Sequence, residues 1–532
     1  MKKILFLLFL FYTVHLHAQS LGIDSTRFVT GLRVGTSINY AIPTADKGIL
    51  FVGYDYGNPG GIIPYFPLDT GVNGNVFIGK IDSNQQISWL KVYGGSDADG
   101  AISACQTADG GYAVLANTLS SNGDVTGFKG VTDIWLLRLD ASGNMLWEKT
   151  YGSSAQDGGM SVAATPDHGF IIAGTSFGHD GDVPFHYGST SLYDWLVIKT
   201  DSAGTVQWSK DLGGTGDEGY TGSILVIDSA YYLVSNSFST DHDCTDTAWH
   251  SGVPTAADLY ILKIDAAGNV LWDSSYGGTN TDGANFAMYD TRDSTIVISG
   301  FTGSNDYMVT GYQGNGDMWV LKVNKNGTLL WQKTLGSSYE DNCTGICAAN
   351  NGRYLAYGNT HNGIIGLENL WLFVLDSAGN ETYNKLFGGV YGVVETSCSI
   401  LPYLNGYVAT GLSGADSFTE GTTYGNFTDG GPFLSYIDTN FSSMVINIKN
   451  GLFSQINIWP NPCYDYLKVS FSDKTTYNII VVNSIGQMVY KATINASTNN
   501  IIINTEGFTG GMYCIEWINE DGYVDTKKFI KN

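Results

Sequence analysis

The fold is decided by residues 133–153, which read DIWLLRLDASGNMLWEKTYGS. Two apolar runs are joined by an Asp-x-x-Gly segment. In such a turn Asp140 can accept backbone N–H groups, and Gly143 can adopt a positive φ. The stretch therefore predicts a β-hairpin. We expect the tryptophan of its second strand, Trp147, to pack between neighbouring copies of the unit.

The same hairpin recurs along the chain. Its turn residue stands at Asp82, Asp140, Asp201, Asp265, Asn324, Asp376 and Asp438. The steps between these positions are 52 to 64 residues, which gives seven copies of about sixty residues. Nine of the twelve tryptophans occupy only two positions of the repeat, so the recurrence is not a product of composition. A repeat of this period predicts a modular fold.

Each repeat also has an apolar strand before the hairpin, such as 111–116, and a shorter strand before that, such as 101–105. Four strands in each of seven repeats predict an all-β, seven-bladed β-propeller over residues 19–449. Six or eight blades remain open if the end repeats pair irregularly. An α-solenoid is excluded because no repeat has a helix-length stretch of 3.6-residue period. A β-helix is disfavoured because its coils are shorter.

Composition excludes several classes of protein. The 532 residues carry 50 Asp and Glu against 26 Lys and Arg, a net charge of −24, which argues against nucleic acid as a partner. Aromatic residues make up 13% of the chain, which argues against a disordered acidic protein. Seven cysteines leave at least one unpaired. Cys343 and Cys347 could form a small loop disulfide, but buried thiols within strands are the better expectation.

The N-terminus predicts export. Lys2 and Lys3 precede a short apolar run, and Ala18 provides a small residue at the expected cleavage site. Residues 1–18 therefore read as a signal peptide, because the apolar run is too short to span a membrane. We expect no transmembrane anchor. The predicted location is secreted or at the outer cell surface, reached through the periplasm.

Residues 450–532 read as six or seven short strands, which suit a small β-sandwich. Nearly all the acidity lies before them, so we place a domain boundary near Asn450. This tail resembles the type A C-terminal sorting domain of the Bacteroidota type IX secretion system. The positions that carry the resemblance are Pro460, Asn461, Pro462, Leu467, Gly486, Gly511, Tyr513, Lys528 and Lys531. The resemblance implies an Ig-like sandwich recognised by the type IX machinery; an adhesive sandwich is the alternative.

The repeats themselves resemble those of secreted Bacteroidota propeller proteins. The hairpins are also similar to those of pyrroloquinoline-quinone-type propellers. The adjacent-cysteine pair of those dehydrogenases is missing here, so their activity is not expected.

Acidic loops provide the candidate binding site. Loops between blades and loops between the second and third strands share one face of a propeller, and here both sets are rich in carboxylates. The candidate ligand-binding residues are Asp99, Asp124, Asp157, Asp180, Asp182, Asp217, Asp243, Asp282 and Asp341. Three interpretations compete: turn-capping within each blade, Ca²⁺ as a cofactor held by oxygen ligands, and contacts to a glycan.

Histidines and catalytic motifs add little. His179, His186, His242 and His250 flank acids in corresponding loops of two successive blades, where a transition-metal site is conceivable, although loop histidines are usually just solvated. No Gly-x-Ser-x-Gly, His-Glu-x-x-His or phosphate-loop motif occurs. Paired carboxylates for glycoside hydrolysis remain open. The leading hypothesis is a propeller that binds a glycan or a surface protein. The alternatives are an exported polysaccharide-degrading enzyme and a passive surface module.

Overall fold

The computed structural model describes residues 36–532, apart from 56–73, 85–86, 190, 220, 247–255, 362–367, 388–394, 414–430, 438–442, 447–456, 471–476, 484–487, 495–499 and 520–523. The predicted signal peptide lies outside the described residues. Within the described part, regular structure is β-strand except for one short 3₁₀ helix, Asn350–Gly352. No helix in this part is long and apolar enough to cross a membrane.

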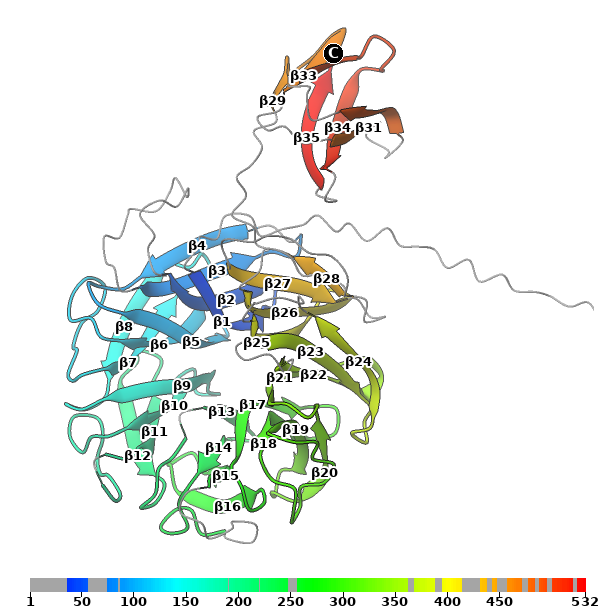
Figure 1. The fold of residues 1–532 in the computed structure, drawn as a ribbon. Coiled ribbons are helices and arrows are strands. Elements are labelled where there is room, and N and C mark those ends of the chain that lie inside the picture. Colours follow the sequence, from blue (N-terminus) through cyan, green and yellow to red (C-terminus); the bar gives the residue numbers. More distant parts are fainter. Residues whose placement is uncertain are drawn as a thin grey trace, which may run out of the picture.

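Seven four-stranded antiparallel sheets follow one another along the chain and are arranged as the blades of a propeller (Figure 1). Blades 1 to 4 consist of β1 (Thr36–Pro43), β2 (Ile49–Asp55), β3 (Asn75–Ile81), β4 (Ile87–Tyr93); β5 (Asp99–Gln106), β6 (Tyr112–Thr118), β7 (Asp133–Leu139), β8 (Met145–Tyr151); β9 (Asp157–Ala164), β10 (Phe170–Ser176), β11 (Asp194–Thr200), β12 (Val206–Leu212); and β13 (Ser223–Ile227), β14 (Ala230–Ser237), β15 (Asp258–Ile264), β16 (Val270–Tyr276). Blades 5 to 7 consist of β17 (Asp282–Asp290), β18 (Thr295–Thr302), β19 (Asp317–Asn324), β20 (Leu329–Leu335); β21 (Asp341–Ala348), β22 (Tyr354–His361), β23 (Glu368–Leu375), β24 (Glu381–Phe387); and β25 (Glu395–Tyr403), β26 (Gly406–Ser413), β27 (Gly431–Ile437), β28 (Ser443–Ile446). The prediction of seven blades is confirmed.

The ring closes between blade 7 and blade 1. The backbone N–H of Ala41 in β1 donates to Ser399 Oγ in β25 over 3.3 Å. The hydroxyl of Tyr403 donates to the carbonyl of Asp82 over 2.9 Å. Ile38 of blade 1 and Leu401 of blade 7 share one apolar core. Each sheet is built from consecutive strands, so closure rests on these side-chain contacts and not on a sheet shared by the two ends of the ring.

The middle strands are buried on both faces because each blade packs against two neighbours. Every residue of β7 and of β11 is buried, whereas the outer strand β8 is mixed. The apolar clusters span adjacent blades: Val76 of blade 1 packs in the same core as Tyr112 and Trp135 of blade 2. This explains why the middle strands read as continuous apolar runs and not as an alternating pattern.

The repeated hairpin forms as its sequence predicts. Asp140 Oδ1 accepts the backbone N–H groups of Ser142 and Asn144, each over 2.8 Å, and Gly143 has a φ of 77°. In blades 1 to 5 the tryptophan of the outer strand reaches the hairpin of the next blade. Trp89 Nε1 donates to the carbonyl of Ala141 over 3.2 Å. The same bond recurs at Trp208–Ala266 and Trp331–Ser377. The tryptophans therefore connect blades, as expected.

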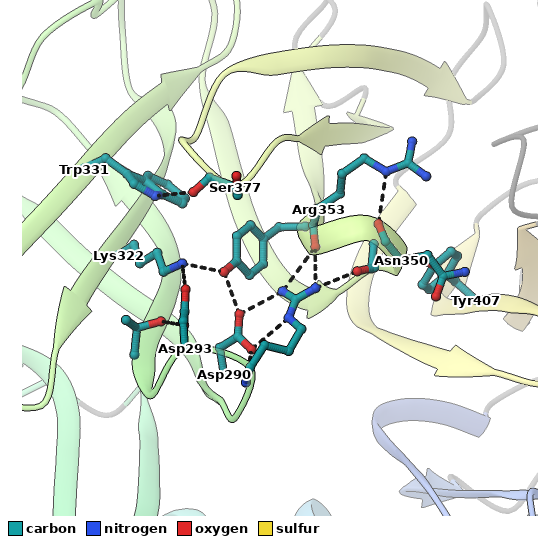
Figure 2. A network of polar contacts seen from close by, with 12 residues as sticks. Asp290, Asp293, Lys322, Trp331, Asn350, Arg353, Ser377 and Tyr407 are labelled. Atoms are coloured by element: carbon teal, nitrogen blue, oxygen red, sulfur yellow. Dashed lines mark hydrogen bonds and ion pairs between the residues drawn. The ribbon is translucent and has the colours of Figure 1, made fainter.

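A polar network links blades 5, 6 and 7 on the hairpin side (Figure 2). The Arg292 guanidinium forms a two-point ion pair with Asp290 and donates to the carbonyl of Ala349 over 2.6 Å. The hydroxyl of Tyr354 in blade 6 donates to Asp290 Oδ2 over 2.6 Å. The hydroxyl of Tyr407 in blade 7 accepts the N–H of Asn350 over 3.1 Å. Three successive blades are thus bonded together away from the acidic loops.

The C-terminal strands form two sheets. One contains β29 (Asn457–Trp459), β30 (Tyr466–Ser470) and β33 (Asn500–Asn504); the other contains β31 (Tyr477–Asn483), β32 (Met488–Ile494), β34 (Gly511–Asn519) and β35 (Val524–Lys531). Leu467, Val481 and Phe529 lie in the common core. This is the small sandwich expected from the sequence.

The two cysteines that could form a loop disulfide are free thiols. Both lie in β21, but Cys343 packs in the core between blades 5 and 6, whereas Cys347 packs in the core between blades 6 and 7. Burial raises the pKa of the Cys343 thiol to about 12. Both cysteines are therefore buried thiols within a strand, which was the better of the two expectations from the sequence.

Candidate functional site

Four of the candidate acids begin an inner strand and are buried: Asp99, Asp157, Asp282 and Asp341. Each accepts a backbone N–H from the turn that precedes its strand. The donors are Gly95 at 2.8 Å, Ser153 at 2.6 Å, Gly278 at 2.8 Å and Ser337 at 2.6 Å, respectively. Burial raises the pKa of all four carboxyls. These carboxylates hold the turns between blades in place.

The other candidate acids lie in the second set of loops or beside them. Asp124 and Asp182 each accept the N–H of an inter-blade glycine over 3.1 Å, and Asp180 accepts the N–H of Ser154 over 2.7 Å. Asp217 accepts the N–H of Tyr193 over 2.7 Å. Asp243 is partly buried, which raises the pKa of its carboxyl, while a hydrogen bond from Tyr187 opposes that rise. The two loop sets are thus joined on one face, which we call the loop face.

A cleft of about 670 Å³ opens on the loop face around blade 5. Its lining comes from the turn before β17, the end of β18, the β18–β19 loop and the turn before β21. The lining residues are Ala256, Thr279, Asn280, Thr281, Phe301, Gly303, Tyr312, Asn315, Gly316, Glu340, Asp341 and Asn342. Asn280, Asn315 and Glu340 are exposed, and the rings of Phe301 and Tyr312 are partly exposed. Of the nine candidate acids, Asp341 is the one that lines this cleft.

A second group of ionisable side chains was only partly anticipated. His186, Asp194 and Asp211 lie with one potential ligand atom each within 4.8 Å of one another, and Glu218 is close by. Burial, followed by the neighbouring charges of Asp194 and Glu218, raises the pKa of Asp211 to about 10. Of these four residues, His186 is among the candidates that the sequence indicated, and the three acids are not. A signal was available, because Asp211 stands where other blades have Thr150, Ser275 and Thr334.

Two of the other candidate histidines, His179 and His242, are not part of this group. His242 stacks on the ring of Tyr187 with a centroid distance of 4.4 Å. His179 stands beside Asp180, whose carboxyl pKa is lowered mainly by hydrogen bonds from Ser154. His250 lies outside the described residues.

The positions that carry the sorting resemblance are placed as follows. Leu467 is fully buried, and Tyr513 is buried with its hydroxyl donating to the carbonyl of Thr509 over 2.7 Å. Asn461 Oδ1 accepts the N–H of Ile530 over 2.9 Å, which ties the Pro460–Pro462 segment to β35. Gly511 and Lys528 pair with Lys531 and Cys514 across β34 and β35. Gly486 lies outside the described residues.

Comparison with known families decides the role of this tail. Residues 457–532 match the family described as a secretion system C-terminal sorting domain. The tail is a type IX sorting domain. The protein is therefore a secreted or cell-surface propeller protein that engages the type IX secretion machinery.

Outside the sorting domain, the chain is similar to a part of one curated protein. The regulatory protein FlaEY of Caulobacter vibrioides is 28% identical over 188 residues, which cover 33% of this chain and 19% of that protein. The chain thus spans about a fifth of the length of this curated relative.

Solved structures with some likeness include a Neurospora crassa Pan2 WD40 domain, at 11% identity and a TM-score of 0.36, covering 76% of this chain and 88% of that one. Prolyl oligopeptidase B from Galerina marginata has 8% identity and a TM-score of 0.42, covering 90% and 56%. A DUF4221 family member from Bacteroides vulgatus has 10% identity and a TM-score of 0.31, covering 56% and 83%.

Proposed function

We propose that this exported propeller binds a glycan in the cleft around blade 5. The observation that supports this is the chemistry of the lining. Phe301 and Tyr312 offer aromatic faces on which a sugar ring can stack, and Asn280, Asn315 and Glu340 offer polar groups for its hydroxyls. An open concave site with a few aromatic and convergent polar groups is a usual form of small-ligand site. A surface protein is the other ligand class that the loop face could take.

The buried acids of the loop face support the site indirectly in this proposal. Asp282 and Asp341 hold the turns on either side of blade 5 through the N–H groups of Gly278 and Ser337. These turns carry Asn280 and Glu340 into the cleft. The ligand would therefore meet the exposed residues of the turns, while the repeated aspartates keep those turns in place.

The experiment is a glycan array probed with the full mature chain, once with Ca²⁺ and once with a chelator. For a glycan that binds, we expect Tyr312→Ala and Glu340→Gln each to lower the affinity at least about tenfold, which is about 1.4 kcal/mol. Tyr307→Ala is the matched control, because Tyr307 lies in the same loop, is 62% exposed and does not line the cleft. Loss of binding with the chelator would identify Ca²⁺ as a cofactor.

Failure of the array in both conditions would refute the glycan proposal and leave a protein ligand as the better candidate. Equal losses in Tyr307→Ala and Tyr312→Ala would refute the cleft as the site. Release of shortened sugars from a bound glycan would instead favour the alternative hypothesis of an exported polysaccharide-degrading enzyme.

A further inference from the structure

Blade 3 departs from the repeat at positions that meet in space. The N–H of the residue after His186 donates to the aspartate that begins β11. The same bond is present in blades 2 and 5, where the residue equivalent to His186 is Phe128 and Tyr312, respectively. Asp211 in β12 replaces the threonines of blades 2 and 5. Those threonines donate to loop carbonyls: Thr150 to Thr126 over 2.9 Å and Thr334 to Thr310 over 2.8 Å.

The next blade departs as well. Glu218 stands where blades 2, 3, 5 and 6 have the inner-strand aspartates described above. Its Oε1 accepts the hydroxyl of Ser237 over 3.0 Å, but its Oε2 accepts no hydrogen bond from a described residue. The carboxylates of Asp211 and Glu218 both lie against that of Asp194. One histidine and three acids therefore converge where blades 2 and 5 have an aromatic ring, a threonine and two aspartates.

The distances fit a shared cation. His186 Nδ1 is 3.1 Å from Asp194 Oδ2 and 3.6 Å from Asp211 Oδ2. Zinc binds histidine nitrogen and carboxylate oxygen at about 2.0–2.2 Å, so neighbouring ligand atoms of a tetrahedral site are about 3.4 Å apart. The side chains of Asp194 and Asp211 are fully buried, and that of His186 is 3% exposed. These three side chains are therefore shielded from solvent.

The atoms that face this point have no hydrogen-bond partner among the described residues. They are His186 Nδ1, Asp194 Oδ1, both carboxylate oxygens of Asp211 and Glu218 Oε2. Asp317 Oδ1 and Asp157 Oδ1, at the positions equivalent to Asp194 and Glu218, lack a partner as well, so the unpartnered atoms particular to this cluster are those of His186 and Asp211. A buried polar atom without a partner is costly, and a buried carboxylate more so. Among the described residues no lysine or arginine forms an ion pair with Asp194, Asp211 or Glu218, and Lys129 of blade 2 pairs with Asp182 at 3.2 Å. His186 is therefore the one described side chain that can place a positive charge among these three acids.

We propose that His186, Asp194 and Asp211 bind a divalent transition-metal ion, with Zn²⁺ as the best fit and Glu218 as an adjacent carboxylate that adds negative charge. Imidazole nitrogen is a common ligand of zinc and its neighbours in the periodic table, whereas Ca²⁺ takes six to eight oxygen ligands.

Such an ion would fix the β10–β11 loop to blade 3. The residue after His186 is Tyr187, whose ring stacks on His242 of blade 4, and Phe185 meets Tyr187 edge-on with a centroid distance of 4.7 Å. Phe185 is 53% exposed. The metal would thereby hold an aromatic pair on the loop face at the junction of blades 3 and 4.

The test uses the full mature chain, unfolded in urea with a chelator and refolded with Zn²⁺, Mn²⁺, Ca²⁺ or no metal. We expect about one equivalent of Zn²⁺ to remain after dialysis, measured by elemental mass spectrometry. The Tm should rise with the logarithm of free Zn²⁺, because an ion that binds only the folded chain stabilises it by mass action. The proposal would be overturned if the chain retained neither Zn²⁺ nor Mn²⁺, or if it retained only Ca²⁺.

Two variants return blade 3 to the repeat and should fold. Asp211→Thr and His186→Phe introduce the residues that blade 2 carries at these positions, and each should lower Zn²⁺ affinity at least about 100-fold. Asp211→Thr should also have a higher Tm than the wild type in metal-free buffer, since it removes a buried carboxyl group whose oxygens lack hydrogen-bond partners among the described residues. His179→Ala is the control and should retain the ion. Equal Zn²⁺ retention by wild type and Asp211→Thr would place the ion elsewhere and refute this site.

Discussion

The contact between Trp89 and the next blade leads to a prediction at Gly143. This glycine has a φ of 77°, and a Cβ added to it would lie 2.7 Å from two atoms of the Trp89 ring. An ordinary carbon–carbon contact is about 3.5–4.0 Å, so the ring would have to move by about 1 Å. We therefore expect Gly143→Ala to strain the turn and to push blade 1 away from blade 2.

The matched control is Gly110→Ala in the β5–β6 turn of the same blade. Gly110 has a φ of 86°, but a Cβ there would meet nothing within 4 Å. Both substitutions force alanine into left-handed backbone, at a cost of about 1–2 kcal/mol in the free energy of unfolding. Only Gly143→Ala also incurs overpacking, about 1–3 kcal/mol, and the loss of the bond from Trp89 Nε1 to Ala141, about 1 kcal/mol.

We therefore expect Gly143→Ala to destabilise the protein by about 2–4 kcal/mol more than Gly110→Ala does. The assay is urea unfolding followed by tryptophan fluorescence and near-ultraviolet circular dichroism, with equal m-values as the condition for comparing midpoints. The pair is then repeated in a Trp89→Leu background, where the ring is absent and the two costs should converge. Equal costs in the wild-type background, or an unchanged difference without Trp89, would refute the reasoning.

Three further predictions concern other parts of the molecule. Burial raises the pKa of Asp317 to about 6, so its contribution to stability is fully present below about pH 4 and is lost as the pH rises to 6. Asp317→Asn should abolish this fall in the free energy of unfolding, which is at most about 3 kcal/mol, measured by urea unfolding from pH 3.5 to 7.5. In the sorting domain, Ile503→Ala should cost about 2–5 kcal/mol because Ile503 is fully buried, whereas Ile502→Ala on the same strand, where Ile502 is 63% exposed, should stay within about 0.5 kcal/mol, as measured by hydrogen exchange of the tail. Cys343 should resist iodoacetamide in the native protein at pH 8 and react after unfolding, as seen by peptide mass spectrometry; rapid native alkylation would contradict its burial.

The architecture was predictable because its determinants are local and repeated. The turn is specified by Asp140, Gly143 and Asn144, which lie within five consecutive residues, and a tryptophan recurs in the outer strands of blades 1 to 5 with the period of the blade. Ring closure was less accessible from sequence. It depends on contacts such as Ala41 with Ser399, whose residues lie 358 positions apart and belong to no motif.

The candidate site was predictable only in outline. The sequence indicates that acids gather on the loop face, but it does not show that Asp99 points into the blade toward Thr118 and Ser120. The orientation of a turn side chain depends on neighbours supplied by another strand. For the same reason the cleft around blade 5 could not be foreseen, since its aromatic lining comes from β18 and the β18–β19 loop together.

Comparison of the repeats distinguishes acids that stabilise the fold of every blade from acids that occur in one blade only. Where an aspartate recurs at the same position, as at Asp157 and Asp282, the structure gives it the same turn N–H partner in each blade. At the position of Asp211, the outer strands of blades 2 and 5 have threonines whose hydroxyls donate hydrogen bonds to loop carbonyls. Neither carboxylate oxygen of Asp211 has a hydrogen-bond partner among the described residues. A carboxylate that the repeat does not require, buried beside a histidine, is unfavourable unless something positive compensates it. A residue that departs from a repeat is therefore a better guide to a site than an acid that follows it.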